Sequence, residues 1–280
     1  MNRTNIEWVR NPDGGTGYTF NPITGCLNHN NGLCKGGSFP CYAYRLANGR
    51  LKQRYLANKN IATMRLEEIQ TKGLEYTDIY EIITDPFYPR FWVKRLEEPM
   101  RVKKPSGVFV CDMSDLFGVG IPEQWTGSVM NFIEACPQHR FYLLTKQPQN
   151  LIKFSPFSDN CYIGVTATRY WKYVDACNYL SQIKAEVKFL SLEPLLSWDS
   201  KASYFFNRSG IAWLIIGAQT KPYKPPKIEW VNEIVEAADK AGIPVFLKDN
   251  LSPLLKYPIE YRWAFIEDRG CYHIRQELPK

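Results

Sequence analysis

Short runs of apolar residues recur along the chain from about residue 107 onward, and each run ends abruptly in polar residues. Continuous rather than alternating apolar character indicates strands that are buried on both faces, as in parallel sheets. The runs of this form are GVFVCDMSD (107–115), RFYLLTK (140–146), CYIGVTAT (161–168), VKFLSLEP (187–194), AWLIIGAQ (212–219) and PVFLKDN (244–250).

Helical patterns separate several of these runs. Residues 121–136 begin Ile-Pro-Glu, with the proline near the first turn of a predicted helix. Residues 170–186 carry apolar side chains at a spacing of three, and residues 228–241 end at Gly242, a typical helix stop. The alternation of strands and helices predicts an α/β fold with a parallel sheet.

The N-terminal third is less regular. Residues 18–24 form a plausible first strand, and we expect helices over roughly residues 54–70 and 88–98. No linker or shift in composition divides the chain, so we predict a single domain over residues 1–280. This length suits a full or partial (β/α) barrel of the TIM type with parallel strands.

Three cysteines lie close together in a loop that spans about residues 21–45. Cys26, Cys34 and Cys41 are separated by seven and then six residues, and the segment is rich in Gly and Asn, as loops are. Three loop thiols can hold a metal ion, ligate an iron–sulfur cluster or carry out redox chemistry. A site with three protein ligands instead of four keeps one position open for a substrate or cofactor.

Polar residues end the predicted strands, and in a (β/α) barrel the chemistry takes place at that end. The cysteine loop follows the first predicted strand and would open onto the same mouth. The alternative is that these strands simply meet polar loops. The strand-end residues are Asp112, Ser114, Asp115, Thr145, Lys146, Thr166, Ser191, Glu193, Gln219, Lys248 and Asp249.

The chain has a net charge of +7, which is compatible with a polyanionic partner such as nucleic acid but does not establish one. Basic residues cluster at 45–59, 94–104 and 221–227, where solvated surface charge is the alternative interpretation. No apolar run approaches the ~20 residues that span a bilayer, and no secretory signal is visible. We therefore expect a cytoplasmic protein with reduced thiols and no membrane association.

This combination of motifs resembles the radical S-adenosylmethionine (SAM) superfamily, whose members carry three cysteines in the loop after the first strand of a full or partial (β/α) barrel. More closely, the chain resembles a phage-associated three-cysteine-motif family of unknown function. The pieces that match this family are TNIEW (4–8), NPITGC (21–26), CYA (41–43), MSDLF (113–117), LTK (144–146), IGVTA (163–167), FLSLEPLL (189–196) and WLIIG (213–217). The sequence CYA at residues 41–43 also resembles the corresponding sequence of spore photoproduct lyase, a DNA-repair radical enzyme.

The resemblance implies that Cys26, Cys34 and Cys41 ligate three irons of a 4Fe–4S cluster, with the fourth iron open to SAM. Reductive cleavage of SAM would then give a 5′-deoxyadenosyl radical, acting on a nucleic acid or nucleotide. The resemblance also implies cofactor contacts from Asp112, Ser114, Asp115, Thr166, Ser191, Gln219 and Lys248, and catalytic roles for Lys146, Glu193 and Cys111, the last as a hydrogen-atom donor.

The chain departs from the common superfamily pattern in three respects. Its cysteine spacing is wider than Cys-x3-Cys-x2-Cys, Pro40 replaces an aromatic residue before the third cysteine, and no Gly-Gly-Glu motif follows the second strand. Two alternatives therefore stay open. One is a metal- or cluster-binding barrel without radical chemistry, serving as a structural, nucleic-acid-binding or partner-binding module. The other is a nucleic-acid-binding barrel with incidental thiols. Zinc would need a fourth ligand, which in this loop only His29 could supply.

Overall fold

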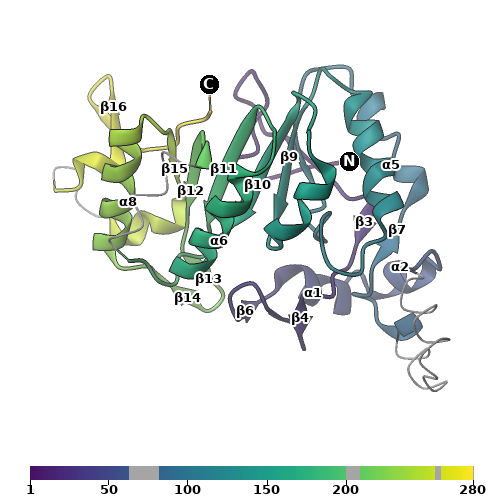
Figure 1. Ribbon diagram of the computed structural model, residues 1–280. Coiled ribbons are helices and arrows are strands. Elements are labelled where there is room, and N and C mark those ends of the chain that lie inside the picture. Colours follow the sequence, from purple (N-terminus) through teal and green to yellow (C-terminus); the bar gives the residue numbers. More distant parts are fainter. Residues whose placement is uncertain (63–81, 200–208, 256–259, 280) are drawn as a thin grey trace. The chain divides into compact units, whose positions relative to one another are not determined.

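The computed structural model describes residues 1–62, 82–199, 209–255 and 260–279. The chain forms two compact units (Figure 1). Unit 1 contains residues 1–5 and 9–150, and unit 2 contains residues 6–8 and 151–280. The prediction of a single domain over residues 1–280 stays a prediction.

Unit 1 is built on a four-stranded sheet in the order β1-β2-β8-β9. β1 runs antiparallel to β2, whereas β2, β8 and β9 are parallel, with Phe20, Val110 and Leu143 side by side. The carboxyl ends of these three strands therefore meet at one edge of the sheet. The strand bounds are β1 Asn2–Arg3, β2 Tyr18–Phe20, β8 Gly107–Val110 and β9 Arg140–Thr145.

Helix α5, Glu123–Glu134, connects β8 to β9 in unit 1. It begins directly after Pro122 and buries Thr126, Val129 and Ile133, which share one face at helical spacing. The helix predicted over residues 121–136 is thus confirmed.

The cysteine-rich part of unit 1 consists of short elements. A two-stranded antiparallel pair joins β3, Ile23–Thr24, to β7, Arg90–Phe91. The predicted first strand, residues 18–24, is therefore two strands with a break between them. The other short elements are β4 His29–Asn30, β5 Leu33–Cys34, β6 Phe39–Pro40, α1 Tyr42–Asn48, α2 Lys52–Ala57, η1 Val93–Arg95, η2 Pro99–Arg101 and η3 Pro148–Asn150.

The helix expected over residues 88–98 is wrong. The guanidinium of Arg90 is buried and donates hydrogen bonds to backbone carbonyls, those of Asn58, Ile83, Asp85 and Tyr88. These bonds cross between segments, so they favour the extended backbone of β7 over a helix that would satisfy only its own groups. Of the helix expected over residues 54–70, α2 is present, and residues 63–70 lie outside the described residues.

Unit 2 contains a four-stranded sheet in which every strand is parallel, in the order β10-β11-β12-β15. Helix α6 follows β10, and helix α8 directly precedes β15. The residue after α8 is Gly242, whose φ of 68° ends the helix. The bounds are β10 Cys161–Thr166, α6 Tyr170–Ser181, β11 Val187–Leu192, β12 Trp213–Ile216, β13 Gln219–Thr220, β14 Tyr223–Lys224, α8 Ile228–Ala241, β15 Val245–Leu247, β16 Phe265–Asp268 and β17 Cys271–Ile274. Short 3-10 helices add η4 Ile152–Phe154, η6 Asp249–Leu254 and η7 Arg262–Ala264.

Trp8 packs against one face of this second sheet. Its ring centroid lies 6.1 Å from those of Phe189 on β11 and Trp213 on β12. An added Cβ at Gly164 would lie 2.2 Å from the Phe189 ring, so the neighbouring strand leaves room for that ring only because it carries a glycine. Trp8, the last residue of the TNIEW segment, is therefore part of the core of unit 2.

The prediction of an α/β fold with parallel strands is confirmed, and all six apolar runs form strands. Within the described residues neither four-stranded set closes on itself, so a closed barrel is not what these sheets show. Three thiols outside the cysteine loop, Cys136, Cys161 and Cys177, are buried. Among the described helices, none is both long and apolar enough to cross a membrane.

Candidate functional site

The first cysteine is positioned by backbone contacts of the segment before it. Cys26 donates its N–H to the carbonyl of Phe87 at 2.9 Å, and Gly25 donates to the carbonyl of Met113 at 3.0 Å. Gly25 has a φ of 89°, and an added Cβ would lie 2.5 Å from the carbonyl oxygens of Phe87 and Tyr88. Only glycine fits here, and this close approach places Cys26 beside the chain that follows β8.

The second and third cysteines belong to a three-stranded antiparallel sheet, β4-β5-β6. Cys34 lies opposite both His29 and Phe39, and Cys41 donates its N–H to the carbonyl of Gly32 at 2.8 Å. Cys34 is buried, while Cys26 and Cys41 are partly buried. Both of the latter pack against one small cluster, formed by Ala43, Ala47, Tyr55, Phe87 and Met113.

His29 has a structural role in this loop. Its ring lies 4.9 Å from the ring of Tyr44 and 5.3 Å from that of Phe87, and its Nδ1 is 3.4 Å from the N–H of Gly32. Burial lowers the pKa of His29, which favours the neutral ring. The ring is thus a packed brace rather than a solvated loop side chain, and only Nε2 is left to serve as a ligand.

Asp115 joins the ends of β8 and β9 beneath the loop. The buried carboxylate accepts hydrogen bonds from Thr145 Oγ1 and from the N–H of Lys146, both at 3.0 Å, and from the N–H of Phe117 at 3.1 Å. Burial raises the pKa of Asp115, although these donors act in the opposite direction. A carboxylate held by three donors fixes the position from which the side chain of Lys146 leaves β9.

Lys146 reaches the cysteine loop. An added Cβ at Gly36 would lie 2.9 Å from Lys146 Cδ and 3.4 Å from Cys34 Sγ, so the loop backbone rests directly on the lysine stem. Burial acts to lower the pKa of Lys146, but Cys34, then Asp115, Cys41 and Cys26 outweigh it, and the pKa is raised. The three thiols of the loop therefore share the surroundings of one ammonium group.

The three thiols of the loop are the candidate metal ligands of this site. Burial raises the pKa of Cys34 and raises that of Cys26 to about 12, so both are neutral thiols until a metal displaces their protons. Among the described residues, no three His, Cys, Asp or Glu side chains lie close enough together to hold one metal ion. Zinc gathers its sulfur ligands at about 2.3 Å from one centre. In a 4Fe–4S cluster, by contrast, the cysteine thiolates bind different irons.

Three further predicted residues follow β8 and mostly support the loop. Asp112 Oδ1 accepts a hydrogen bond from Asn21 Nδ2 at 2.6 Å, and its backbone carbonyl accepts one from the hydroxyl of Tyr42. Ser114 donates its hydroxyl to the carbonyl of Gly25. Cys111 is buried with a φ of 58°, and burial raises its pKa. Asp112 and Ser114 thus bind the cysteine segment itself.

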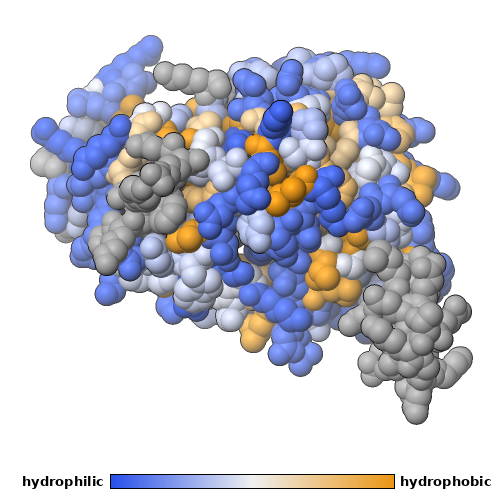
Figure 2. Space-filling view, viewed as in Figure 1, coloured by the Kyte–Doolittle hydropathy of each residue, from blue (hydrophilic) through white to orange (hydrophobic). Residues whose placement is uncertain are grey.

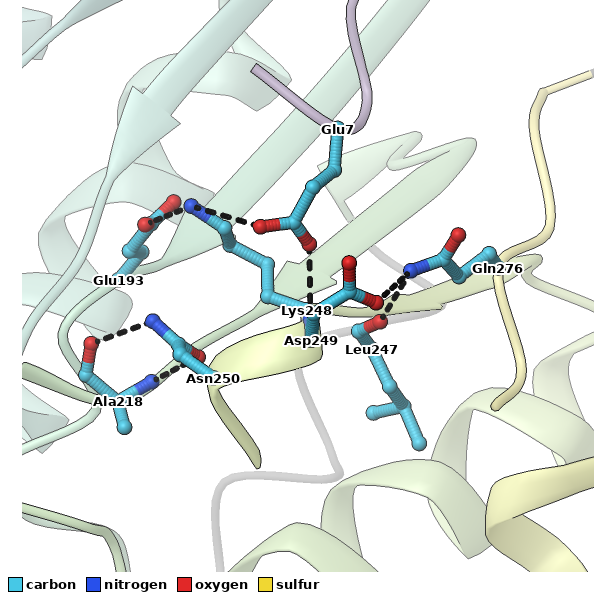
Figure 3. Close-up of polar contacts among 8 residues, drawn as sticks. All are labelled: Glu7, Glu193, Ala218, Leu247, Lys248, Asp249, Asn250 and Gln276. Atoms are coloured by element: carbon cyan, nitrogen blue, oxygen red, sulfur yellow. Dashed lines mark hydrogen bonds and ion pairs between the residues drawn. The ribbon is translucent and has the colours of Figure 1, made fainter. Parts of the chain in front are cut away.

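A second polar group lies in unit 2 (Figure 3). Lys248 forms an ion pair with Glu193 Oε1 and lies 3.9 Å from Glu7 Oε1, while Glu7 Oε2 accepts the N–H of Asp249 at 2.8 Å. Burial acts to lower the pKa of Lys248, but the negative charges of Glu193 and Glu7 outweigh burial, so the pKa of Lys248 is raised. Burial raises the pKa of Glu7. An added Cβ at Gly217 would lie 3.0 Å from Lys248 Cδ, so glycine makes room for this pair.

Two more predicted residues share this face of the sheet. Thr166 and Ser191 are direct partners across β10 and β11, and Glu193 follows Ser191 by two residues along the chain. Thr166 Oγ1 is buried and, within the part of the chain that the structure describes, has no hydrogen-bond partner. Gln219 instead donates to the carbonyl of Pro222 at 3.0 Å and belongs to the β13–β14 hairpin.

Sequence reasoning missed Glu7 and Asn250. Beyond its place in the TNIEW motif, nothing in the sequence alone singles out Glu7, yet its carboxylate lies 3.9 Å from Lys248 Nζ and accepts the N–H of Asp249. The side-chain amide of Asn250 forms two hydrogen bonds with the backbone of Ala218 (Figure 3). It accepts one from the N–H of Ala218 at 2.9 Å and donates one to the carbonyl of Ala218 at 3.0 Å. Glu7 lies within the TNIEW motif and could have been found there, whereas no local pattern distinguishes Asn250.

These features define an α/β protein with a three-cysteine loop at the carboxyl ends of parallel strands, next to a buried carboxylate and a lysine. Residues 3–252 match the model of a family described as "Protein of unknown function (DUF5131)", and the chain belongs to this family. No curated protein and no solved structure matches the chain.

Proposed function

We propose that the chain is a radical SAM-type enzyme that binds a 4Fe–4S cluster through Cys26, Cys34 and Cys41. One observation carries the proposal, namely that the backbone of the cysteine loop at Gly36 rests on the stem of Lys146 next to Cys34 Sγ, at the end of β9. Cluster thiolates add negative charge to a largely buried site, and a fixed cation offsets part of that charge.

The protein's own groups in this proposal hold and neutralise the loop. Asp115 fixes the start of the Lys146 side chain, and Gly25 and Gly36 let the backbone approach closely on either side of the loop. Asp112 and Ser114 tie the chain after β8 to Asn21 and Gly25. Cys26, Cys34 and Cys41 would hold the cluster, which would supply the electron for reductive cleavage of the SAM sulfonium.

The finer parts of the proposal rest on the resemblance to the radical SAM superfamily. They are the full or partial (β/α) barrel, SAM as the cofactor, and a nucleic acid or nucleotide as the substrate. Glu193 and Lys248 stay candidates for the reaction, and Thr166 supports a role for this group because its buried hydroxyl lacks a partner among the described residues.

The test is anaerobic reconstitution with iron and sulfide, followed by EPR of the reduced protein with and without SAM. We expect a 4Fe–4S signal that changes on adding SAM and is lost in Cys34→Ala. Cys271→Ala is the matched control, because this thiol is exposed on β17 and is not one of the proposed ligands. Stoichiometric zinc binding, or no cluster uptake by the unsubstituted protein, would overturn the proposal.

A further inference from the structure

The segment that carries the cysteine loop contains no acidic residue over a long stretch. Residues 14–66 include no Asp and no Glu, whereas the whole chain has 28 of them. The same stretch carries several basic residues, Lys35, Arg45, Arg50, Lys52, Arg54, Lys59 and Arg65. In a protein of mixed charge, such a one-sided stretch produces a local positive field next to the loop.

Five of these side chains are exposed on α1, α2 and the adjoining turns, and this group is called the basic face. Arg45, Arg50, Lys52, Arg54 and Lys59 are all exposed. Among the described residues, none of the five pairs with a carboxylate, although exposed basic residues elsewhere in unit 1 do, as in Lys104 with Asp13. The charge of this face is therefore available to a partner.

Two guanidinium groups of this region share one indole ring. The Cζ atoms of Arg54 and Arg95 lie 6.0 Å and 3.9 Å from the ring centroid of Trp92. Burial lowers the pKa of Arg95, and the like charge of Arg54 lowers it further. Cations held together in this way are stabilised when an anion such as a phosphate binds beside them.

Exposed apolar side chains lie next to the cysteines on the same segment. Tyr42, which follows Cys41, is 49% exposed, and Leu33, which precedes Cys34, is 48% exposed. Figure 2 shows a few apolar residues among hydrophilic ones at the lower edge of this view, where Figure 1 places α1 and β4. An exposed aromatic ring such as that of Tyr42 beside basic side chains is a combination that binds single strands by stacking.

We infer that the face formed by Arg45, Arg50, Lys52, Arg54 and Lys59 binds the phosphate backbone of a single-stranded nucleic acid beside the cysteine loop. The inference names a substrate class, and its functional meaning rests on the function proposed above. The basic side chains contact phosphates and give affinity without sequence preference. A base stacked on Tyr42 would then lie next to Cys41, where the reaction is proposed to occur.

The test is fluorescence anisotropy of the full chain with a labelled oligonucleotide of about 20 nucleotides, as single-stranded DNA and as RNA of the same sequence. Titrations span roughly 50 to 200 mM salt, where backbone contacts are strongly salt-dependent. The test variant is R45A/R50A/K52A. Its control, K153A/K184A/K240A, removes three exposed lysines of unit 2 and gives the same change in net charge.

We expect the test variant to bind at least ~10-fold more weakly and to have a log–log salt slope shallower by about 2, since each single-strand phosphate contact contributes ~0.7. The control should bind like the unsubstituted protein. An equal loss in both variants, or no binding by the unsubstituted protein, would overturn the inference. Equally tight binding of an acidic polypeptide would also overturn it and would indicate a protein partner.

The two proposals fail separately. Oligonucleotide binding by a protein that takes up no cluster would leave this inference standing and remove the proposed enzyme function. A SAM-sensitive cluster signal without oligonucleotide binding would do the reverse. Comparing DNA with RNA shows which nucleic acid supplies the phosphates, and R45A/R50A/K52A should keep the cluster signal because it changes none of the proposed ligands.

Discussion

The polar group of unit 2 gives a prediction whose size can be worked from the structure. Lys248 stands between the carboxylates of Glu193 and Glu7, and its side chain is only 14% exposed. Replacing Lys248 by Met keeps most of the buried stem but leaves two carboxylates facing each other without their shared cation. We expect this variant to be clearly destabilised.

Unit charges about 4 Å apart attract by about 4 kcal/mol at an effective dielectric constant of ~20. Removing one member of a buried ion pair costs about 3–5 kcal/mol, because the other charge stays buried. The carboxylate side chains of Glu7 and Glu193 keep 23% and 25% of their exposure, so water relieves part of this cost. We therefore expect Lys248→Met to lower the free energy of unfolding by about 2–3 kcal/mol.

The assay is a double-mutant cycle by urea denaturation with Lys248→Met, Glu193→Gln and the double variant. The double variant should be less destabilised than the two single effects added together, by about 1–2 kcal/mol, because it removes both charges of the pair. Lys240→Met, at an exposed position of α8, is the control and should change stability by less than ~0.5 kcal/mol. Additive single effects, or a Lys248→Met cost as small as the control's, would refute the reasoning.

Three further predictions concern the loop and the pH dependence. Gly25→Ala should reduce iron and sulfide uptake and lower the free energy of unfolding by at least ~2 kcal/mol more than Gly14→Ala does. Both glycines have a positive φ, but only at Gly25 would a Cβ meet backbone atoms, so equal destabilisation by the two variants would contradict this. Asp115→Asn should cost about 1–3 kcal/mol in urea unfolding, because an amide cannot accept all three donors, and unchanged stability would count against the link. Burial raises the pKa of Glu7 above 4.5, so the folded chain binds this proton more tightly, and stability falls as the pH rises from 4.5 through the raised pKa. Thermal scans of Glu7→Gln should lack that fall, and an unchanged profile would assign it to another group.

The sequence predicted the strands and helices of the second half well, because their patterns are set by burial. A strand buried on both faces, such as β10, Cys161–Thr166, has a nearly continuous apolar run in its sequence. The sequence of α8 likewise contains both the apolar face of the helix and the glycine that ends it. The helix prediction over residues 88–98 is wrong because the buried Arg90 side chain donates hydrogen bonds to carbonyls 5, 7 and 32 positions away, which no local apolar pattern records. A buried arginine looks like a surface residue in sequence.

The site shows the same division. The cysteine loop was recognisable, because thiols in a Gly- and Asn-rich segment have few structural uses. The role of Asp115 as a link to Lys146, and that of Glu7 as a partner of Lys248, depend on contacts between residues 31 and 241 positions apart. Such pairings follow from strand order and packing, and spacing along the chain does not reveal them.

The wide spacing of the cysteines has a physical explanation in the sheet β4-β5-β6. The chain leaves Cys26, turns back so that His29 faces Cys34, and turns again so that Cys34 faces Phe39 just before Cys41. Each spacer is therefore long enough to form one side of a small sheet, which the His29 ring braces against Tyr44 and Phe87. A shorter loop could deliver the same three thiols but would lack this support. The wide spacing thus corresponds to added structure between the three cysteines, and it is compatible with our proposal that their thiols act together.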